Sequence, residues 1–419
     1  MKVYSYQYWL AAGLILLVSL VERLTGLDGF SLTLDESTLV ETAKGVLERG
    51  VPSLYVGTMR VDLATYELVP YFIASSISIF GISDFTLRLP TALFGVLTTM
   101  VAFHAGWRLF DWRVGVLVGL LYGLSPWAEH WAHNLFHPSQ TQFFVLLTAL
   151  QVRRLLQDDC VPVRTYYLAA FLFSCAYLSW EGSGFVLPIL LIVAMIMRWG
   201  QWNWLKSPHL WVASGIVILV VALQGIRRVL LQADYLMVGA GKSDVSLPQL
   251  VFTKTNYSPY YYLWNFFATE FHLVLTVIFV LGLVFAARHW NLRFFYAFTI
   301  LAVFFMTNFL GYYNAHYIYY LLPIFLIAAS AATIKFVDYF ASGMTSGLNS
   351  VRIGYQVSEL ALLLLVLAFS TSAGLRFNYL GEEYRNPLRS DVRKELAGID
   401  YRGLSNELMK YYRPGDVVI

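Results

Sequence analysis

Two acidic residues stand where a carboxylate could act as a general base. Asp35 and Glu36 follow the first apolar run of the chain and open a segment with helical periodicity. Acidic residues in the first turn of a helix also favour its dipole, so an N-terminal cap explains the pair equally well. A carboxylate just outside a first membrane helix can instead remove a proton from an attacking group. We predict that Asp35 and Glu36 are the catalytic residues.

Three histidines in residues 127–139 are spaced three and four apart. On a helix, His130, His133 and His137 would share one face, which suits a metal ion or a phosphate. Aromatic residues between them fit an interfacial segment with hydrogen-bonded histidines instead. The spacing matches no complete ligand motif, so a divalent metal stays an alternative and no cofactor is assigned.

Further polar residues lie beside apolar runs. Glu181 stands in a Trp-Glu-Gly-Ser-Gly string, where it either meets a ligand or forms a solvated hinge. Two arginines open residues 227–260 and suit an anionic ligand or lipid headgroups. The predicted substrate-binding residues are Arg60, His133, His137, Glu181, Arg227, Arg228, Tyr257 and His316.

The composition indicates a membrane protein. Of the 419 residues, 58% are hydrophobic and only 13% are charged, whereas soluble domains carry about a quarter charged residues. The net charge of +3 is too small to suggest nucleic-acid binding. Cys160 and Cys175 fall in a loop and in an apolar run, so no disulfide framework is indicated.

Apolar runs recur along the whole chain. A helix needs about 20 apolar residues to cross the hydrocarbon core, and shorter runs require tilted or partly buried helices. We predict an all-α polytopic bundle of about 11 transmembrane helices, at residues 8–24, 89–109, 114–127, 140–156, 165–180, 184–197, 210–226, 261–287, 294–310, 318–335 and 355–373.

Residues 66–80 decide the topology. The segment is apolar but short and contains Pro70, so we predict a helix lying at the membrane interface. With that choice the arginine-rich short loops all fall on one side, as the positive-inside rule requires. The N-terminus is then cytoplasmic and the C-terminus extracytoplasmic, in a plasma (inner) membrane.

Outward regions follow from this topology. The predicted transmembrane domain is residues 1–375, with outer loops at 26–88, 127–139 and 227–260. The first outer loop contains an amphipathic helix at 36–49, whose apolar residues recur at helical spacing. The tail at 376–419 is charged, and it is either small or the start of a soluble domain.

The chain resembles the GT-C glycosyltransferases, especially the protein O-mannosyltransferases and the lipid A aminoarabinose transferases. The resemblance covers most of the chain, and the order and spacing of its pieces are moderately specific. The pieces are Asp35-Glu36, the strings at 42–50 and 80–90, Ser125-Pro-Trp127, and the strings at 317–323 and 414–418.

This resemblance implies a GT-C-like bundle with interfacial helices in the first outer loop. It implies that Asp35 is the general base of a hexosyltransferase that moves a sugar from a polyprenyl-phosphate donor to an acceptor hydroxyl on the outer face. Arg227, Arg228 or His133 would stabilise the departing phosphate. Membrane lipids and protein partners in a membrane complex are the other expected contacts.

The chain departs from the relatives at several positions. It has His133 and His137 where relatives often carry Arg or Asp, His316 where Arg is usual, and no Glu-Lys-Pro string before residue 66. These departures favour an alternative, a non-catalytic GT-C-like structural subunit of a membrane complex. A transporter is a third reading, but the predicted spans carry almost no charges near the middle of the membrane.

Overall fold

The computed structural model describes residues 6–28, 32, 34–56, 59–63, 65–158, 161–230, 262, 273–309 and 317–344. Several predictions fall outside these residues. They are the span at 355–373, the tail at 376–419, Tyr257 and His316, and the side chain of Arg228.

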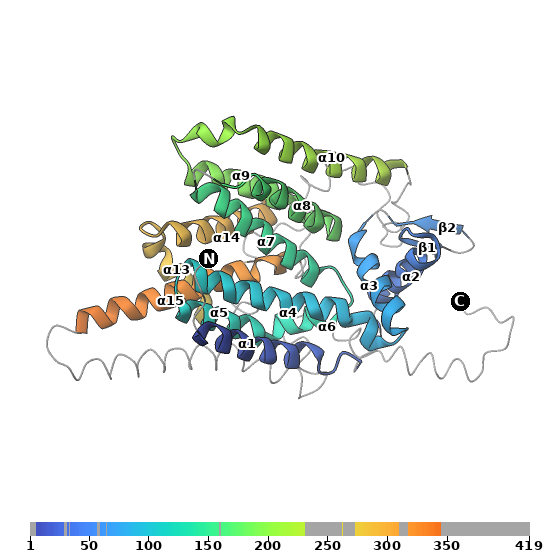
Figure 1. Cartoon of the computed structure of the whole chain (residues 1–419), viewed down its shortest axis with the longest axis horizontal. Coiled ribbons are helices and arrows are strands. Elements are labelled where there is room, and N and C mark those ends of the chain that lie inside the picture. The colour runs from blue at the N-terminus through green and yellow to red at the C-terminus, as the bar shows by residue number, and fades with distance from the viewer. Residues whose placement is uncertain are drawn as a thin grey trace.

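The described residues form a bundle of long helices that run side by side (Figure 1). Each overlaps one of the predicted spans. They are α1 (Tyr6–Leu24), α4 (Asp84–Leu109), α5 (Trp112–Gly123), α7 (Pro138–Gln157), α8 (Arg164–Ser179), α9 (Val186–Met197), α10 (Pro208–Leu230), α13 (Leu273–Ala286), α14 (Trp290–Phe309) and α15 (Leu322–Met344). Short elements between them are α6 (Pro126–His133), η1 (Glu181–Phe185), η2 (Trp202–Lys206) and η5 (Tyr319–Leu321).

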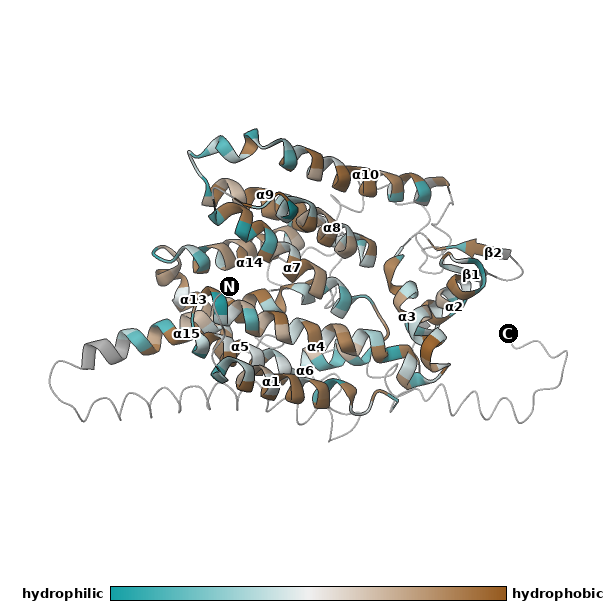
Figure 2. Ribbon diagram, viewed as in Figure 1, coloured by the Kyte–Doolittle hydropathy of each residue, from teal (hydrophilic) through white to brown (hydrophobic). Residues whose placement is uncertain are grey.

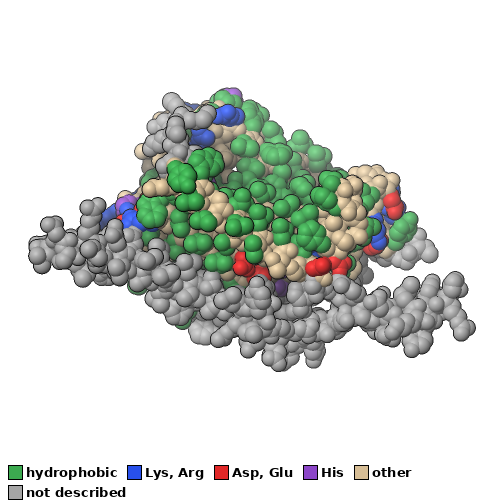
Figure 3. Space-filling view, turned by 60° about the horizontal axis from the view of Figure 1, so that its bottom comes forward, with side chains coloured by type: hydrophobic (Ala, Val, Ile, Leu, Met, Phe, Trp, Pro, Cys, Tyr) green, Lys and Arg blue, Asp and Glu red, His purple; other side chains and the backbone are tan. Residues whose placement is uncertain are grey.

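Hydropathy agrees with a multi-pass membrane protein. Among the described residues, five helices are long and apolar enough to cross a membrane, namely α1, α4, α10, α14 and the stretch 319–339 around α15. Apolar residues follow the lengths of the helices, and hydrophilic ones gather at their ends and in the loops (Figure 2). In Figure 3, hydrophobic side chains cover most of the middle of the face shown. The count of about 11 spans stays a prediction.

One end of the bundle, which we call the hairpin end, carries all the elements between α1 and α4. They are α2 (Leu34–Arg49), the antiparallel strands β1 (Ser53–Val56) and β2 (Met59–Asp62), and α3 (Leu68–Phe80). The helix predicted at 36–49 is confirmed as α2. The β1–β2 hairpin was not predicted from the sequence. A β-carbon on Gly45 would lie 2.3 Å from the carbonyl oxygen of Ser53, so only glycine lets β1 pack on α2.

The orientation of α3 agrees with a segment that does not cross the bundle. This helix lies across the hairpin end rather than along the bundle, and α4 starts from the same end (Figure 1). The loops with the predicted cytoplasmic arginines therefore lie together at the opposite end, which we call the basic end. Its basic residues include Arg108, Arg113, Arg154, Arg164, Arg198, Lys206, Arg288, Arg293 and Lys335.

Close helix packing holds the centre. A β-carbon on Gly106 of α4 would lie 2.9 Å from the Cα of Gly115 of α5, so these two helices touch through their backbones. The turn between them is fixed by Asp111, whose side chain accepts a 3.1 Å hydrogen bond from the amide of Val114. The stretch 319–339, which contains most of α15, is largely buried and contributes to the core, while α10 lies on the outside.

Candidate active site

The two adjacent carboxylates at the start of α2 lie in opposite environments. Glu36 is 1% exposed, and its two oxygens accept hydrogen bonds of 2.9 and 3.1 Å from Nε and Nη2 of Arg88. The amide of Leu135 adds a third, at 2.8 Å. Asp35 is exposed on the same helical turn. Glu36 would have to break three contacts to act as a base, so Asp35 is the accessible carboxylate of the pair.

Arg88 connects the hairpin end to the bundle. It is 2% exposed, and besides Glu36 it binds the carbonyl oxygen of Leu27 with a 2.9 Å hydrogen bond. Because Glu36 also accepts from Leu135, one ion pair joins the end of α1, the start of α2, α4 and the segment after α6. This buried pair fixes the position of the helical turn that carries Asp35.

A second buried charge lies in the last turn of α1. Arg23 is fully buried, donates a 2.8 Å hydrogen bond to the carbonyl of Tyr122, and packs against Gly95. Its Nε and Nη1 have no hydrogen-bond partner among the described residues. The apolar run ending at Leu24 gave no sign of this burial, because an arginine there commonly extends to the membrane surface.

Burial controls the ionisation of two side chains near Arg23. Desolvation raises the pKa of Glu129 to about 8, against the opposing effect of the Arg23 charge. Desolvation, assisted by Arg23, lowers the pKa of His133 to about 4. At neutral pH Glu129 is therefore protonated and His133 is uncharged. His133 can donate or accept a hydrogen bond there, but it carries no positive charge for a phosphate.

The prediction that three histidines share a helical face is wrong. Helix α6 ends at His133 because Asn134 is extended, with φ −95° and ψ 130°, and Pro138 starts the next helix. His130 and His133 lie on α6, whereas His137 stands before α7. Within the part of the chain that the structure describes, no three His, Cys, Asp or Glu residues gather as a metal site would need.

Four aromatic rings form a continuous column, which we call the aromatic stack. His137 is fully buried between Tyr66, at 4.9 Å and 6°, and Trp180, at 5.2 Å and 18°. Trp180 stacks in turn on Tyr317, at 5.1 Å and 8°. Tyr66 adopts a left-handed backbone with φ 51°, which is strained for a bulky residue. The stack joins four segments that are far apart in sequence.

The predicted binding residues Glu181 and Arg227 lie at the hairpin end, and each contacts another residue of this chain. Arg227 forms a 2.9 Å ion pair with Glu67, just before α3, and Gln224 of α10 donates a 3.4 Å hydrogen bond to Glu181. Burial raises the pKa of Glu67, and the charge of Arg227 opposes that shift. The end of α10 is therefore tied to both α3 and η1.

Arg60 holds the hairpin together. It forms a 2.6 Å ion pair with Glu48, donates a 3.0 Å hydrogen bond to the Ser53 hydroxyl, and lies 5.1 Å from the ring centre of Tyr55. These contacts fasten β2 to β1 and to the last turns of α2. Substrate binding by Arg60, like every other residue role predicted above, stays a prediction.

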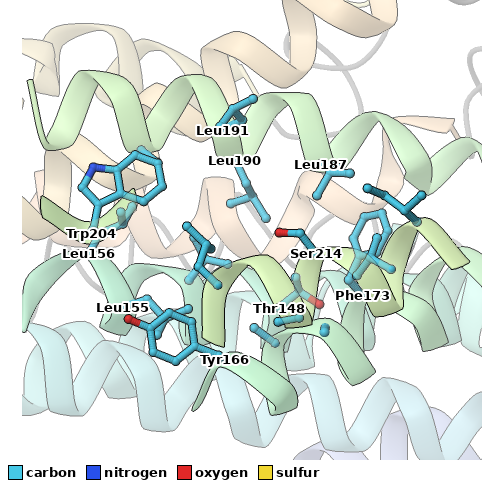
Figure 4. A pocket seen from close by; sticks show the side chains of 18 residues that line it. Thr148, Leu155, Leu156, Tyr166, Phe173, Leu187, Leu190, Leu191, Trp204 and Ser214 are labelled. Atoms are coloured by element: carbon cyan, nitrogen blue, oxygen red, sulfur yellow. The ribbon is translucent and has the colours of Figure 1, made fainter. Parts of the chain in front are cut away.

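An apolar cavity of about 220 Å³ between α7, α8, α9 and α10 offers no catalytic groups (Figure 4). Leucine, alanine and aromatic side chains form most of its wall. Its only side-chain oxygens belong to Thr148, Ser214 and Tyr166. Without a carboxylate, an imidazole or a basic group, this cavity is excluded as the site of acid–base chemistry.

Comparison with known proteins identifies the fold. The family model described as dolichyl-phosphate-mannose-protein mannosyltransferase matches residues 67–224. No protein of curated description matches the sequence. Crystalline ArnT from Cupriavidus metallidurans, bound to undecaprenyl phosphate, superposes with a TM-score of 0.61 and 18% identity, covering 94% of this chain and 75% of ArnT.

Two larger enzymes have a similar fold. The archaeal oligosaccharyltransferase AglB from Archaeoglobus fulgidus, in complex with an inhibitory peptide and a dolichol-phosphate, gives a TM-score of 0.57 at 14% identity, covering 94% of this chain and 60% of AglB. The arabinosyltransferase EmbB from Mycobacterium smegmatis gives 0.50 at 13% identity, covering 98% of this chain and 41% of EmbB. These matches confirm the GT-C fold that the sequence motifs predicted.

Proposed function

We propose that this chain, which has the GT-C glycosyltransferase fold, transfers a sugar from a polyprenyl-phosphate donor to an acceptor hydroxyl at the hairpin end. ArnT binds undecaprenyl phosphate and AglB binds a dolichol-phosphate, and both lipids are polyprenyl phosphates. The donor's apolar tail would lie against the membrane-facing helices. Its phosphate and sugar would lie at the outer surface, beside the turn that carries Asp35.

The observation that carries this proposal is the contrast between Asp35 and Glu36. Glu36 is buried and bound on three sides, which makes it a positioning residue. Asp35 is exposed on the turn that Glu36 holds in place. A general base needs a carboxylate that substrate can reach and a rigid support that keeps it in position. The start of α2 meets both needs.

In the proposed reaction, Asp35 accepts the proton of the acceptor hydroxyl as its oxygen attacks the anomeric carbon. The bond between that carbon and the phosphate oxygen breaks, and the phosphate leaves with the bonding electrons. Attack opposite the leaving group inverts the configuration of the sugar. The negative charge that develops on the phosphate requires a cation or a hydrogen-bond donor nearby.

Arg227 can supply that cation by changing partner. It is one-third exposed in its ion pair with Glu67. Burial raises the pKa of Glu67, so this carboxylate takes up a proton more readily than an exposed one when Arg227 turns away. Arg227 would thus move to the phosphate without leaving a buried negative charge behind.

The test is Asp35→Asn, with Glu41→Gln as the matched control. Glu41 is an exposed carboxylate on the same helix and pairs with Lys44. The purified protein in nanodiscs would be given a panel of polyprenyl-phosphate sugars, and release of polyprenyl phosphate would be measured. We expect Asp35→Asn to lower the rate by about 100-fold or more, while Glu41→Gln stays near wild type. A folded Asp35→Asn variant that transfers at the wild-type rate would overturn the proposal.

One observation supports a structural subunit as the second candidate. Three arginines at the hairpin end, Arg60, Arg88 and Arg227, are each held in an ion pair with an acid of this chain. In such a subunit these pairs would be permanent, and the protein would neither bind nor consume a donor. Failure of every polyprenyl-phosphate lipid in the panel to protect the protein against thermal unfolding would favour this reading.

A further inference from the structure

A separate cavity of about 320 Å³ opens at the basic end, away from Asp35. Its wall comes from four places in the chain, namely the α4–α5 turn, the last residue of α7, the α13–α14 turn and the middle of α15. The polar residues that line it are Asp111, Gln157, Arg288, His289, Asn291 and Lys335. None of them takes part in the proposed transfer.

Three basic side chains meet at this cavity. The positive charges of Lys335 and Arg288 lie close enough to His289 to lower its pKa, in addition to the larger effect of burial. Neither Arg288 nor Lys335 forms an ion pair with any described residue. Like charges repel one another unless an anion lies between them, so this group of side chains is arranged for a negative ligand.

The one acid on the wall does not neutralise these charges. Asp111 forms a 2.9 Å ion pair with Arg113. Arg113 also forms a 2.9 Å ion pair with Asp338. Asp111 also accepts from the amide of Val114. With these contacts made, Asp111 is oriented toward its own turn, and Arg288 and Lys335 remain available to a ligand.

Arg153 occupies the side-chain oxygens of the two amide residues in the cavity wall, Asn291 and Gln157. It donates to the side-chain oxygen of Asn291 at 3.1 Å and to that of Gln157, and its guanidinium lies 5.4 Å from the ring centre of Trp290. Asn291 donates its own NH2 to the carbonyl of Leu109 at 2.7 Å. Because the oxygen of Gln157 is engaged, its NH2 group is left as a donor at the rim of the cavity.

We propose that this cavity binds the phosphate group of an anionic phospholipid. Two cationic side chains, an imidazole and an amide donor suit phosphate oxygens. Leu109, Phe110, Leu292 and Ile334 form an apolar part of the same wall, which a free phosphate would not use and a glycerol-linked acyl chain would. Helix α13, which leads into the α13–α14 turn of the cavity wall, carries the exposed apolar residues Leu281 and Val284, which suit contact with membrane lipid.

The test compares lipid retention by three forms of the full-length protein. Each would be reconstituted with equal parts of phosphatidylglycerol and phosphatidylcholine, extracted in mild detergent, and examined by native mass spectrometry. We expect the wild type to retain phosphatidylglycerol about 10-fold over phosphatidylcholine. In Arg288→Gln/Lys335→Gln the preference should fall to about 2-fold or less.

The matched control is Arg154→Gln/Arg164→Gln, which removes two exposed arginines from the basic end outside the cavity. It should keep the preference of the wild type. Equal loss in both double variants would show a diffuse surface charge effect and overturn the proposal, as would retention of the preference by Arg288→Gln/Lys335→Gln. Displacement of the lipid by 10 mM inorganic phosphate would show that a free anion is the ligand and would overturn the lipid assignment.

Discussion

The two ends of the bundle use charged residues in different ways. At the hairpin end, Glu36 and Arg88 are each 2% exposed in a two-point ion pair. At the basic end, Arg113 is 16% exposed and pairs with Asp111 and Asp338, whose side chains are about one-third exposed. Electrostatic interactions strengthen as water is excluded, so the buried pair fixes geometry while the exposed pairs adapt. Precise geometry is therefore concentrated where the proposed chemistry takes place.

Among the substitutions proposed for the two ends, replacement of Arg88 should cause the largest loss of unfolding free energy. Arg88→Leu leaves Glu36 buried without its cation, and such losses cost about 3–5 kcal/mol of unfolding free energy. Denaturant unfolding in mixed micelles would measure the change. Glu36→Leu/Arg88→Leu removes both charges and should recover part of the loss. An Arg88→Leu variant as stable as wild type would show that the pair does not hold the hairpin end.

Removal of a central ring from the aromatic stack should come next. Trp180→Ala opens a cavity between His137 and Tyr317 and should lower the unfolding free energy by about 3 kcal/mol. Trp180→Phe keeps a ring in the column and should cost less than half as much. The same unfolding measurement applies. Equal losses of unfolding free energy in the two variants would show that a ring at position 180 is not what stabilises the column.

The hairpin end should also respond to pH through Glu129. Its folded pKa of about 8 exceeds the ordinary value of 4.5, so the folded state holds the proton more tightly and stability falls as pH rises between these values. His133, with a folded pKa of about 4, acts oppositely, and its contribution is complete above pH 6.5. Of these two groups, only Glu129 changes stability appreciably from pH 6.5 to 8, and it lowers the unfolding free energy by about 2 kcal/mol.

The thermal midpoint of the wild type should therefore fall by about 2–4 °C over that interval, and Glu129→Gln should remove the fall. Glu41→Gln, an exposed change on α2, should leave it in place. A slope that survives in Glu129→Gln would mean that another group binds the proton.

The smallest loss of unfolding free energy is expected for a substitution at the basic end. Arg113→Ala should cost about 1 kcal/mol or less, because both of its ion pairs are partly solvated. Raising the salt concentration from 0.1 M to 1 M should shrink the cost further, while the cost of Arg88→Leu should stay nearly constant. Equal salt dependence at the two sites would remove the distinction between the ends.

The elements that the sequence predicted are those with strong local periodicity. Apolar spacing located α2 and the bundle helices, and the short apolar segment with Pro70 forms the helix α3, whose place at the membrane interface stays a prediction. The strands β1 and β2 have four residues each, too few for a clear pattern. The Gly57-Thr58 dipeptide between them is a usable turn signal, since glycine is favoured in two-residue hairpin turns.

The details of the site depend on contacts that no local pattern contains. Asp35 and Glu36 are neighbours of similar chemistry, and Arg88, 52 positions away, decides which of them is buried. The shared histidine face failed for a reason that the sequence did contain. Pro138 is a helix-start signal, since proline is favoured at the first position of a helix, and α7 begins there after the extended Asn134 has ended α6. The burial of Arg23 depends on α4 and α6, which the first helix cannot reveal.

The aromatic stack joins residues that are far apart in the sequence, and this separation has a consequence for biosynthesis. Helices α4 and α5 are neighbours in the chain and can pair as soon as the ribosome has released both. Trp180 must wait for Tyr317, and Gln142 of α7 binds the carbonyl oxygen of Tyr319 across 177 positions. A nascent chain that already displays Asp35 therefore lacks the support of its own last helices. The hairpin end becomes complete only after α15 has entered the membrane, so synthesis itself sets the moment at which a site there can start to work.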